Sequence, residues 1–299
     1  SYNDFVYTTN PCAIMVSARR VTGGVNGALN SSGANGAAWY LTFKGFSIIG
    51  DPASVKTSDG IYCPEIGLSR FEDLLFRECR SGVKARDLYL VNMAQCHFEL
   101  STRPIEHFST SSATARGTTL NMETCSANRT EYGWRFIGLN YSSFNNCSND
   151  DWAADQGDVA NKYAWSFSDC DIVLNGCGAE SSTNTEAATN AGGIYIENTS
   201  KIVMNACNFR CVVDATSLAA LSTIDNSSLI VNQTAMSNTV GGSVKKIILQ
   251  NGANVVCDGW YGAANLDDMI TVADTTSSLR AFQRNEMQAA VANATAWSF

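Results

Sequence analysis

Two carboxylates recur at one position of a short repeated pattern in this chain. The pattern is Asn-x-Cys followed by three residues, and it ends three stretches: "YSSFNNCSND" (141–150), "DIVLNGCGAE" (171–180) and "KIVMNACNFR" (201–210). The last residue of each stretch differs, and these residues are Asp150, Glu180 and Arg210. Two carboxyl groups held close together can act as a general acid and a base or nucleophile.

Strand geometry predicts that these end residues share an outer face. Successive side chains of a strand point to opposite faces, so an inward Cys177 places Glu180 outward. Counting three residues on from Cys125 adds Asn128 to the same column. If the repeats stack in register, Asn128, Asp150, Glu180 and Arg210 lie about 4.8 Å apart, one on each strand.

A repeat of this length indicates a solenoid. The cysteines at 125, 147, 177 and 207 are separated by 22, 30 and 30 residues, and periods of 20–50 residues are typical of stacked coils. The segments "WRF" (134–136), "WSF" (165–167) and "IYI" (194–196) precede three of these cysteines and predict a second stack, with Arg135 and Tyr195 outward. We predict an all-β, right-handed, single-stranded parallel β-helix.

The Asn-x-Cys residues themselves have structural roles in this interpretation. The Asn series forms a hydrogen-bonded ladder at a bend of which Asn175 is the hinge, and the Cys series fills the interior. The gap of 17 residues between Cys79 and Cys96 is too short for a coil and leaves the register there open.

Composition excludes several function classes. The net charge of −8 argues against a nucleic acid partner, because phosphate contacts need clustered Lys and Arg. The sequence contains no run of 18 apolar residues, so no membrane span is expected. The first residues show no signal peptide. The 11 cysteines lack metal-site spacing, so neither a metal nor a cofactor is expected.

Three regions are predicted. Residues 1–40 contain a Gly/Asn-rich tract and form an irregular or leading coil segment. Residues 41–277 form the β-helix. Residues 278–299 follow a Ser cap with helix-favouring residues and are expected to form a helix that caps the solenoid.

The coil sequences resemble the bacteriophage tailspike and pectate-lyase-like β-helix families. The resemblance rests on "SDGIYCPEIGLSRFEDLLFREC" (58–79), "YSSFNNCSNDDW" and "IVLNGCGAESS", and covers roughly residues 40–260. It implies a side-by-side homotrimer on a virion tail that binds and cleaves a bacterial surface polysaccharide, whether capsule, exopolysaccharide or O-antigen. Fold likeness alone does not establish an activity.

The acid pair is the predicted catalytic centre of such an enzyme. Asp150 and Glu180 are the main candidates, with Asp151 beside them, and insertions at 148–164 and 178–193 are expected to wall a groove. Trp152 is available to stack on a sugar ring. The predicted substrate-binding residues are Trp152, Arg210, Asn128, Arg135 and Tyr195. The carboxyl separation does not choose between a retaining and an inverting mechanism.

Two alternatives stay open beside glycoside hydrolysis. A polysaccharide lyase would need a base near a uronic acid, and Asp150, Asp151 and Asp155 would suit the calcium ion that such enzymes often hold. In a glycan-binding adhesin without catalysis, the same column would be a hydrated surface.

Overall fold

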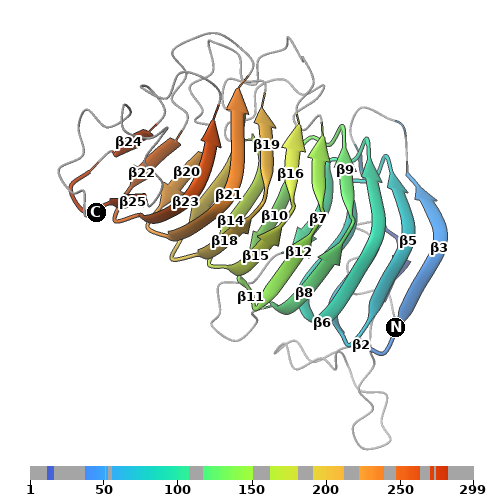
Figure 1. Ribbon diagram of the computed structural model, residues 1–299. Coiled ribbons are helices and arrows are strands. Elements are labelled where there is room, and N and C mark those ends of the chain that lie inside the picture. Colours follow the sequence, from blue (N-terminus) through green and yellow to red (C-terminus); the bar gives the residue numbers. More distant parts are fainter. Residues whose placement is uncertain are drawn as a thin grey trace, which may run out of the picture.

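The strands of this protein wind into one parallel solenoid. The computed structural model describes residues 12–16, 38–50, 52, 56–107, 117–150, 162–180, 191–211, 222–238, 247–262, 270–272 and 274–281. Its strands form one sheet in which each coil pairs in parallel with the coil before and the coil after it (Figure 1). The all-β parallel β-helix predicted from the sequence is therefore confirmed.

Most strands belong to one of three rows that run along the solenoid. Row A contains β1 (Cys12–Met15), β7 (Arg103–His107), β10 (Trp134–Ile137), β14 (Lys162–Ser168), β17 (Ala191–Glu197), β20 (Ser222–Asp225), β22 (Ile247–Gln250) and β24 (Ile270–Val272). Row B contains β12 (Ser142–Asn145), β15 (Asp171–Asn175), β18 (Lys201–Asn205) and β25 (Ser278–Ala281). Row C contains β9 (Ser126–Asn128), β13 (Ser148–Asp150), β16 (Gly178–Glu180) and β19 (Asn208–Cys211).

Longer strands turn corners and serve more than one row. Those that run from row B into row C are β3 (Thr42–Ile49), β5 (Arg70–Arg77), β21 (Ser228–Asn238) and β23 (Asn254–Gly262). The early coils also have a short row between rows A and B, made of β2 (Ala38–Trp39), β11 (Leu139–Asn140) and parts of β4 (Asp59–Gly67), β6 (Ser81–Glu99) and β8 (Gly117–Glu123). The single strand β6 contributes to all four rows.

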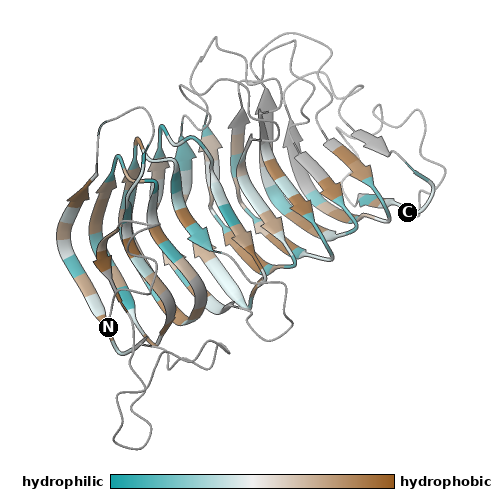
Figure 2. Ribbon diagram, turned by 180° about the vertical axis from the view of Figure 1, so that it is seen from behind, coloured by the Kyte–Doolittle hydropathy of each residue, from teal (hydrophilic) through white to brown (hydrophobic). Residues whose placement is uncertain are grey.

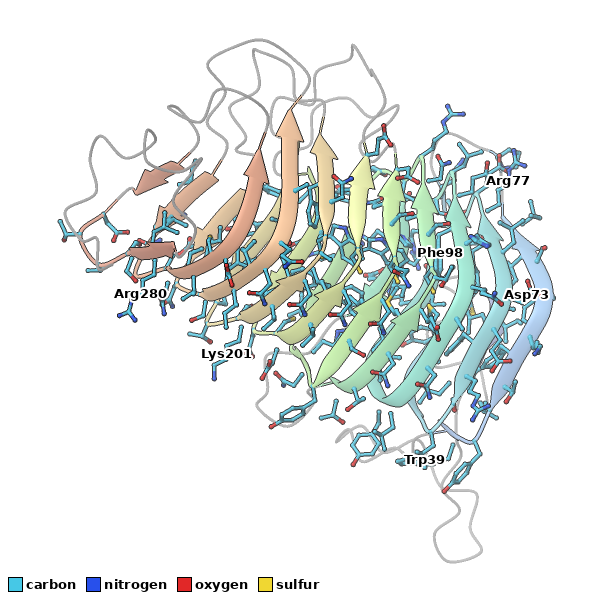
Figure 3. The ribbon with its side chains drawn as sticks, viewed as in Figure 1. Trp39, Asp73, Arg77, Phe98, Lys201 and Arg280 are labelled. Carbon is cyan, nitrogen blue, oxygen red and sulfur yellow. The ribbon has the colours of Figure 1, made fainter. Side chains whose placement is uncertain are left out.

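Columns of identical or similar side chains fill the interior. Trp134 pairs in register with Trp165 and Phe136 with Phe167, and all four side chains are fully buried. The two indole rings lie 5.6 Å apart. Burial of a large apolar side chain contributes about 1.5–3 kcal/mol, so the predicted stack of row A is a principal source of stability. Figure 2 shows the alternation of apolar and polar residues along the strands, and Figure 3 shows Phe98 between the rows.

The repeated Asn residues form the predicted ladder at the end of row B. The side-chain amide of Asn175 donates to Asn145 Oδ1 and that of Asn205 to Asn175 Oδ1, both at 2.8 Å. Asn232 extends the ladder by one more coil, again at 2.8 Å. Each amide thus satisfies the next, which holds neighbouring coils at one register.

The repeated cysteines fill the interior column that follows the ladder. Cys125, Cys147, Cys177 and Cys207 are buried, and the ten cysteines described with side chains are all free thiols. Their thiols donate to backbone oxygens, for example Cys177 Sγ to Phe144 O of the preceding coil at 3.2 Å. Burial raises the pKa of the Cys207 thiol to about 11, so this thiol is neutral at pH 7 and fills space in the interior.

The hinge of the bend is not Asn175, as the sequence pattern indicated, but the residue after it. Positive φ angles occur at Asn146, Gly176 and Ala206, the middle residues of the three Asn-x-Cys motifs. The backbone N–H of each donates to the carbonyl oxygen of the ladder Asn in the next coil. Asn145, Asn175 and Asn205 stay in strand conformation, because their amides must face one another along the axis.

The short gap between Cys79 and Cys96 has a simple cause: the two residues belong to different columns. Cys96 pairs in register with Leu74, at the place that the repeated cysteines occupy. Cys79 lies at another corner, where its backbone N–H donates to Ser101 Oγ. Counting from residue 74 to residue 96 restores a coil of ordinary length.

The ends of the described region differ from the predicted boundaries. β1 pairs with β4 and β2 with the end of β4, so parts of the leading segment already belong to the solenoid. At the other end, residues 278–281 form β25 instead of the start of a helix, because Leu279 is buried and the strand pairs with β23. Residues 282–299 lie outside the described residues. No helix in the described ranges has the length and apolarity to cross a membrane.

Ala206 provides a test of the bend. A side chain in the left-handed conformation costs free energy that glycine avoids, and the Ala206 methyl group is exposed, with a φ of 49°. We expect Ala206→Gly to raise the free energy of unfolding by about 1 kcal/mol. The matched control is Ala235→Gly within β21, which should lower it by about 0.5–1 kcal/mol. Denaturant titration of both variants measures the difference, and equal destabilisation by both would contradict this account.

His107 is a titratable residue in the apolar interior. It lies in β7, inward like its register partner Ala85, and is almost fully buried. Among the described residues, neither ring nitrogen has a hydrogen-bond partner of good geometry. Burial lowers the pKa of His107 to about 4, so the ring is neutral at pH 7.

His107 should therefore make the fold sensitive to acid. Because its folded pKa lies below the ordinary value of about 6.5, the unfolded chain binds the proton first, and stability falls as the pH drops from about 6.5 to 4. The penalty at pH 4 is about 3 kcal/mol. We expect His107→Phe to remove this part of the acid loss, measured as the difference in unfolding free energy from the wild type at pH 7.5 and pH 4. A difference that does not change with pH would refute the assignment.

Candidate active site

The end residues of row C form the column that the repeat spacing indicated. Asp150 pairs in register with Asn128 on one side and Glu180 on the other, and Glu180 pairs with Arg210. Asp150 is half-buried and the Glu180 side chain is exposed. Adjacent strands are about 4.8 Å apart, which places the backbones of the two acids one rung from each other.

The column continues beyond the residues recognised in the sequence. Glu99 precedes Asn128, and Arg77 precedes Glu99. Arg77 Nε lies 4.0 Å from Glu99 Oε2, and Figure 3 shows Arg77 at the outer end of its strand. The order along the axis is therefore guanidinium, carboxylate, amide, carboxylate, carboxylate and guanidinium.

A second outward column runs beside the first on row C. It contains His97, Ser126, Ser148 and Gly178, which pair in register along the axis. His97 Nδ1 lies 2.8 Å from Ser126 Oγ, and Ser148 Oγ is 3.5 Å from Asp150 Oδ2. Beside Asp150 and Glu180 this column carries the small residues Ser148 and Gly178.

Sequence reasoning missed His97 and Glu99, although counting residues from the repeated cysteine of that coil would have found them. They stand one and three residues after Cys96, as Ser148 and Asp150 stand after Cys147. The misleading comparison of Cys96 with Cys79 hid this correspondence.

Contacts across the interior hold the acid-bearing strands in place. Trp134 Nε1 donates to Ser148 O, and Trp165 Nε1 donates to Gly178 O, each at 3.0 Å. The buried amide of Asn149 donates to Ala164 O at 2.9 Å. Row A indoles therefore fix the first residue of each acid-bearing strand, the kind of support that a precise site needs.

The structure does not bring Arg135 and Tyr195 to the acids. Both lie on row A, in β10 and β17. The Trp134 indole points inward from row A and reaches row C, so the outward side chains of the two rows point away from each other. The Tyr195 hydroxyl instead donates to Glu197 at 3.1 Å, and burial, together with the charge of Glu197, raises the pKa of Tyr195.

Other predicted members fall outside what the structure describes. Asp151 and Trp152 lie in the insertion after β13, outside the described residues, as does Asp155. For Arg210 the backbone position is described and the side chain is not. Among the described residues, no group of three or more His, Cys, Asp or Glu side chains is arranged to hold a metal ion.

The fold is a parallel β-helix of the type found in phage tailspikes. The chain is similar to the gp42 tailspike of Acinetobacter phage vb_AbaP_AS12, with a TM-score of 0.64 and 18% sequence identity. The match covers 82% of this chain and 46% of the tailspike, so the chain spans about half of that protein's length. At this identity the likeness establishes the fold alone.

The remaining comparisons add nothing to this classification. QnrB1, a plasmid-mediated fluoroquinolone resistance protein, matches with 12% identity over 82% of this chain and 91% of its own. Its TM-score of 0.19 is too low to support a structural relationship. No family model matches the chain, and no curated protein matches it.

Proposed function

We propose that this chain is the β-helical part of a tailspike-type depolymerase, which binds a bacterial surface polysaccharide and hydrolyses it with Asp150 and Glu180. The observation that carries the proposal is the register of row C, where these two acids are direct neighbours between Asn128 and Arg210. A virion-tail location and a homotrimer, both implied by the tailspike resemblance, belong to the same proposal.

The acid pair has the chemistry that glycoside hydrolysis requires. One carboxyl group protonates the glycosidic oxygen as the bond to the anomeric carbon breaks, and the other either deprotonates a water molecule or attacks that carbon. Neighbouring backbones about 4.8 Å apart, with side chains that can splay, are compatible with either geometry.

The flanking residues supply binding groups of two kinds. Asn128 offers an amide to sugar hydroxyl groups on one side of Asp150. Arg210, one rung beyond Glu180, offers a guanidinium to an anionic sugar, since this group pairs well with carboxylates. Asp151 and Trp152 directly follow β13 and extend the same site in this proposal. Arg135 and Tyr195 have no part in it, because they face away from row C.

Hydrolysis is tested by removing each acid while keeping its shape. We expect Asp150→Asn and Glu180→Gln each to reduce the rate of oligosaccharide release at least a hundredfold, with a bacterial capsule that the wild type cleaves as the substrate. The reason is that general acid–base catalysis typically contributes 10²–10⁴-fold to the rate. The matched control is Glu99→Gln, which removes a carboxylate from the same column two rungs from Asp150. Wild-type turnover by either acid variant would contradict the catalytic role of that residue.

Product analysis by mass spectrometry separates hydrolysis from its alternatives. Hydrolysis adds one water to each cleaved bond, whereas a lyase gives an unsaturated sugar that absorbs in the ultraviolet. Loss of cleavage on chelation of calcium would favour the lyase. Retention of the glycan without any shortening would indicate an adhesin.

A further inference from the structure

A serine and a histidine form a hydrogen-bonded pair on the outer face of row C. His97 Nδ1 lies 2.8 Å from Ser126 Oγ, and the two residues are register partners on β6 and β9. In the tautomer with the proton on Nε2, Nδ1 accepts the hydrogen bond from the serine hydroxyl. An imidazole that can take the proton of a hydroxyl group makes its oxygen nucleophilic, at separations of about 2.6–3.2 Å. The pair therefore has the geometry of a nucleophile and its base.

The packing of the solenoid does not require this pair. The outward column to which it belongs runs in register from Leu75 through His97 and Ser126 to Ser148. The residue type changes from coil to coil, as expected of positions outside the core. Ser148 repeats the hydroxyl group of Ser126 one coil further on, where Ser126 and Gly178 are its register partners. A matched serine without a histidine partner is thus present in the same column.

The inward residues of the two strands hold the pair in position. Phe98 follows His97 and Ala127 follows Ser126, and both are buried in the core. Because successive side chains of a strand point to opposite faces, these core contacts fix the outward direction of the pair. His97 is exposed and Ser126 is half-buried. A substrate can therefore approach the serine oxygen from the solvent while the strands keep their places.

Asn128 can stabilise the oxygen of a carbonyl group that the serine attacks. It lies on the same outward face of β9 as Ser126, two residues on, which is about 7 Å along the strand. Its side chain is exposed and carries an amide that can donate hydrogen bonds. Side-chain amides are among the groups that stabilise the negative charge of a tetrahedral intermediate. The outward carboxylate of β6, Glu99, faces Arg77 at 4.0 Å, so the arrangement is a pair rather than a triad.

The surroundings of the pair favour a short acyl group. Leu75, the register partner of His97 on the side away from Ser126, is half-buried and apolar. The other described residues next to the pair on the outer face of row C are polar. One leucine side chain offers enough apolar surface for an acetyl methyl group, but it cannot cover a long chain. Asp150 is the register partner of Asn128, so the pair lies directly beside the acids along the axis.

We propose that Ser126 and His97 form an esterase site, which removes short acyl groups from the hydroxyl groups of sugars. The sugar as the alcohol part of the ester rests on the proposed function, since a glycan held by the acids along row C passes over the pair. Cleavage of the ester itself does not depend on the acids.

The reaction needs only the ester and water. Ser126 Oγ forms a bond to the carbonyl carbon as its proton passes to His97 Nδ1, and the carbonyl oxygen takes the electron pair of the double bond. When the double bond forms again, the bond to the sugar oxygen breaks, and that oxygen receives the proton from His97. A water molecule then attacks the acyl group on Ser126 in the same way. This second step releases the carboxylic acid and returns the proton to the serine.

Hydrolysis of 4-nitrophenyl acetate by the whole chain tests the site, and acetate release from glucose pentaacetate tests it with a sugar ester. We expect Ser126→Ala and His97→Gln each to reduce both rates at least a hundredfold, because general acid–base catalysis typically contributes about 10²–10⁴-fold. The matched control Ser148→Ala removes the same hydroxyl group one coil further on and should keep the full rate. 4-Nitrophenyl octanoate should react more slowly than the acetate. A fluorophosphonate probe should label Ser126, as located by peptide mass spectrometry.

Four outcomes overturn the proposal. These are no fluorophosphonate label on Ser126, an undiminished rate in Ser126→Ala, an equal loss of rate in Ser148→Ala, and no acetate release from glucose pentaacetate. The second would assign the ester cleavage to the imidazole alone. Wild-type oligosaccharide release by Asp150→Asn, together with loss of ester cleavage in Ser126→Ala, would refute the proposed glycan hydrolysis and leave the esterase site standing.

Discussion

The structure depends on the parallel register between successive coils. Each coil forms backbone hydrogen bonds with its neighbours on every row, so a slip of one residue would turn an inward column outward. The inner columns prevent such a slip, since Trp134 must meet Trp165 and Phe136 must meet Phe167. The Asn ladder also fixes the register at the end of row B, where each side-chain amide bonds the corresponding Asn of the neighbouring coil.

This register aligns the outward residues of successive coils into columns on the surface. Once the inner columns are in register, each outward position becomes a line of side chains about 4.8 Å apart, free to vary because it does not affect packing. The acids of row C use this freedom. There the chain departs from its own repeat, since Asp150 and Glu180 stand side by side between Asn128 and Arg210.

Much of the fold could be predicted because inner residues repeat visibly. The Asn-x-Cys motif and the "WRF", "WSF" and "IYI" segments each mark one column, and counting from them correctly gives Asn128, Asp150, Glu180 and Arg210 as register partners. The same counting failed at Cys79, because two corners of one coil both carry a buried Cys. It also failed at residues 278–281, where local helix preference was outweighed by pairing with β23. The catalytic roles within the column remain predictions.

The sequence by itself determined the order of side chains along the axis. That order follows from strand alternation and a fixed period, which are local properties of the chain. Only the tertiary structure decided how the columns are arranged around the axis. Arg135 and Tyr195 share the coil periodicity of Asp150, yet they face the opposite way, because the corner angles between rows depend on packing across the interior by Trp134 and Trp165. The contact between Trp39 and Tyr89, whose ring centroids lie 5.6 Å apart, has the same origin, since residues 50 positions apart meet only when the coils stack.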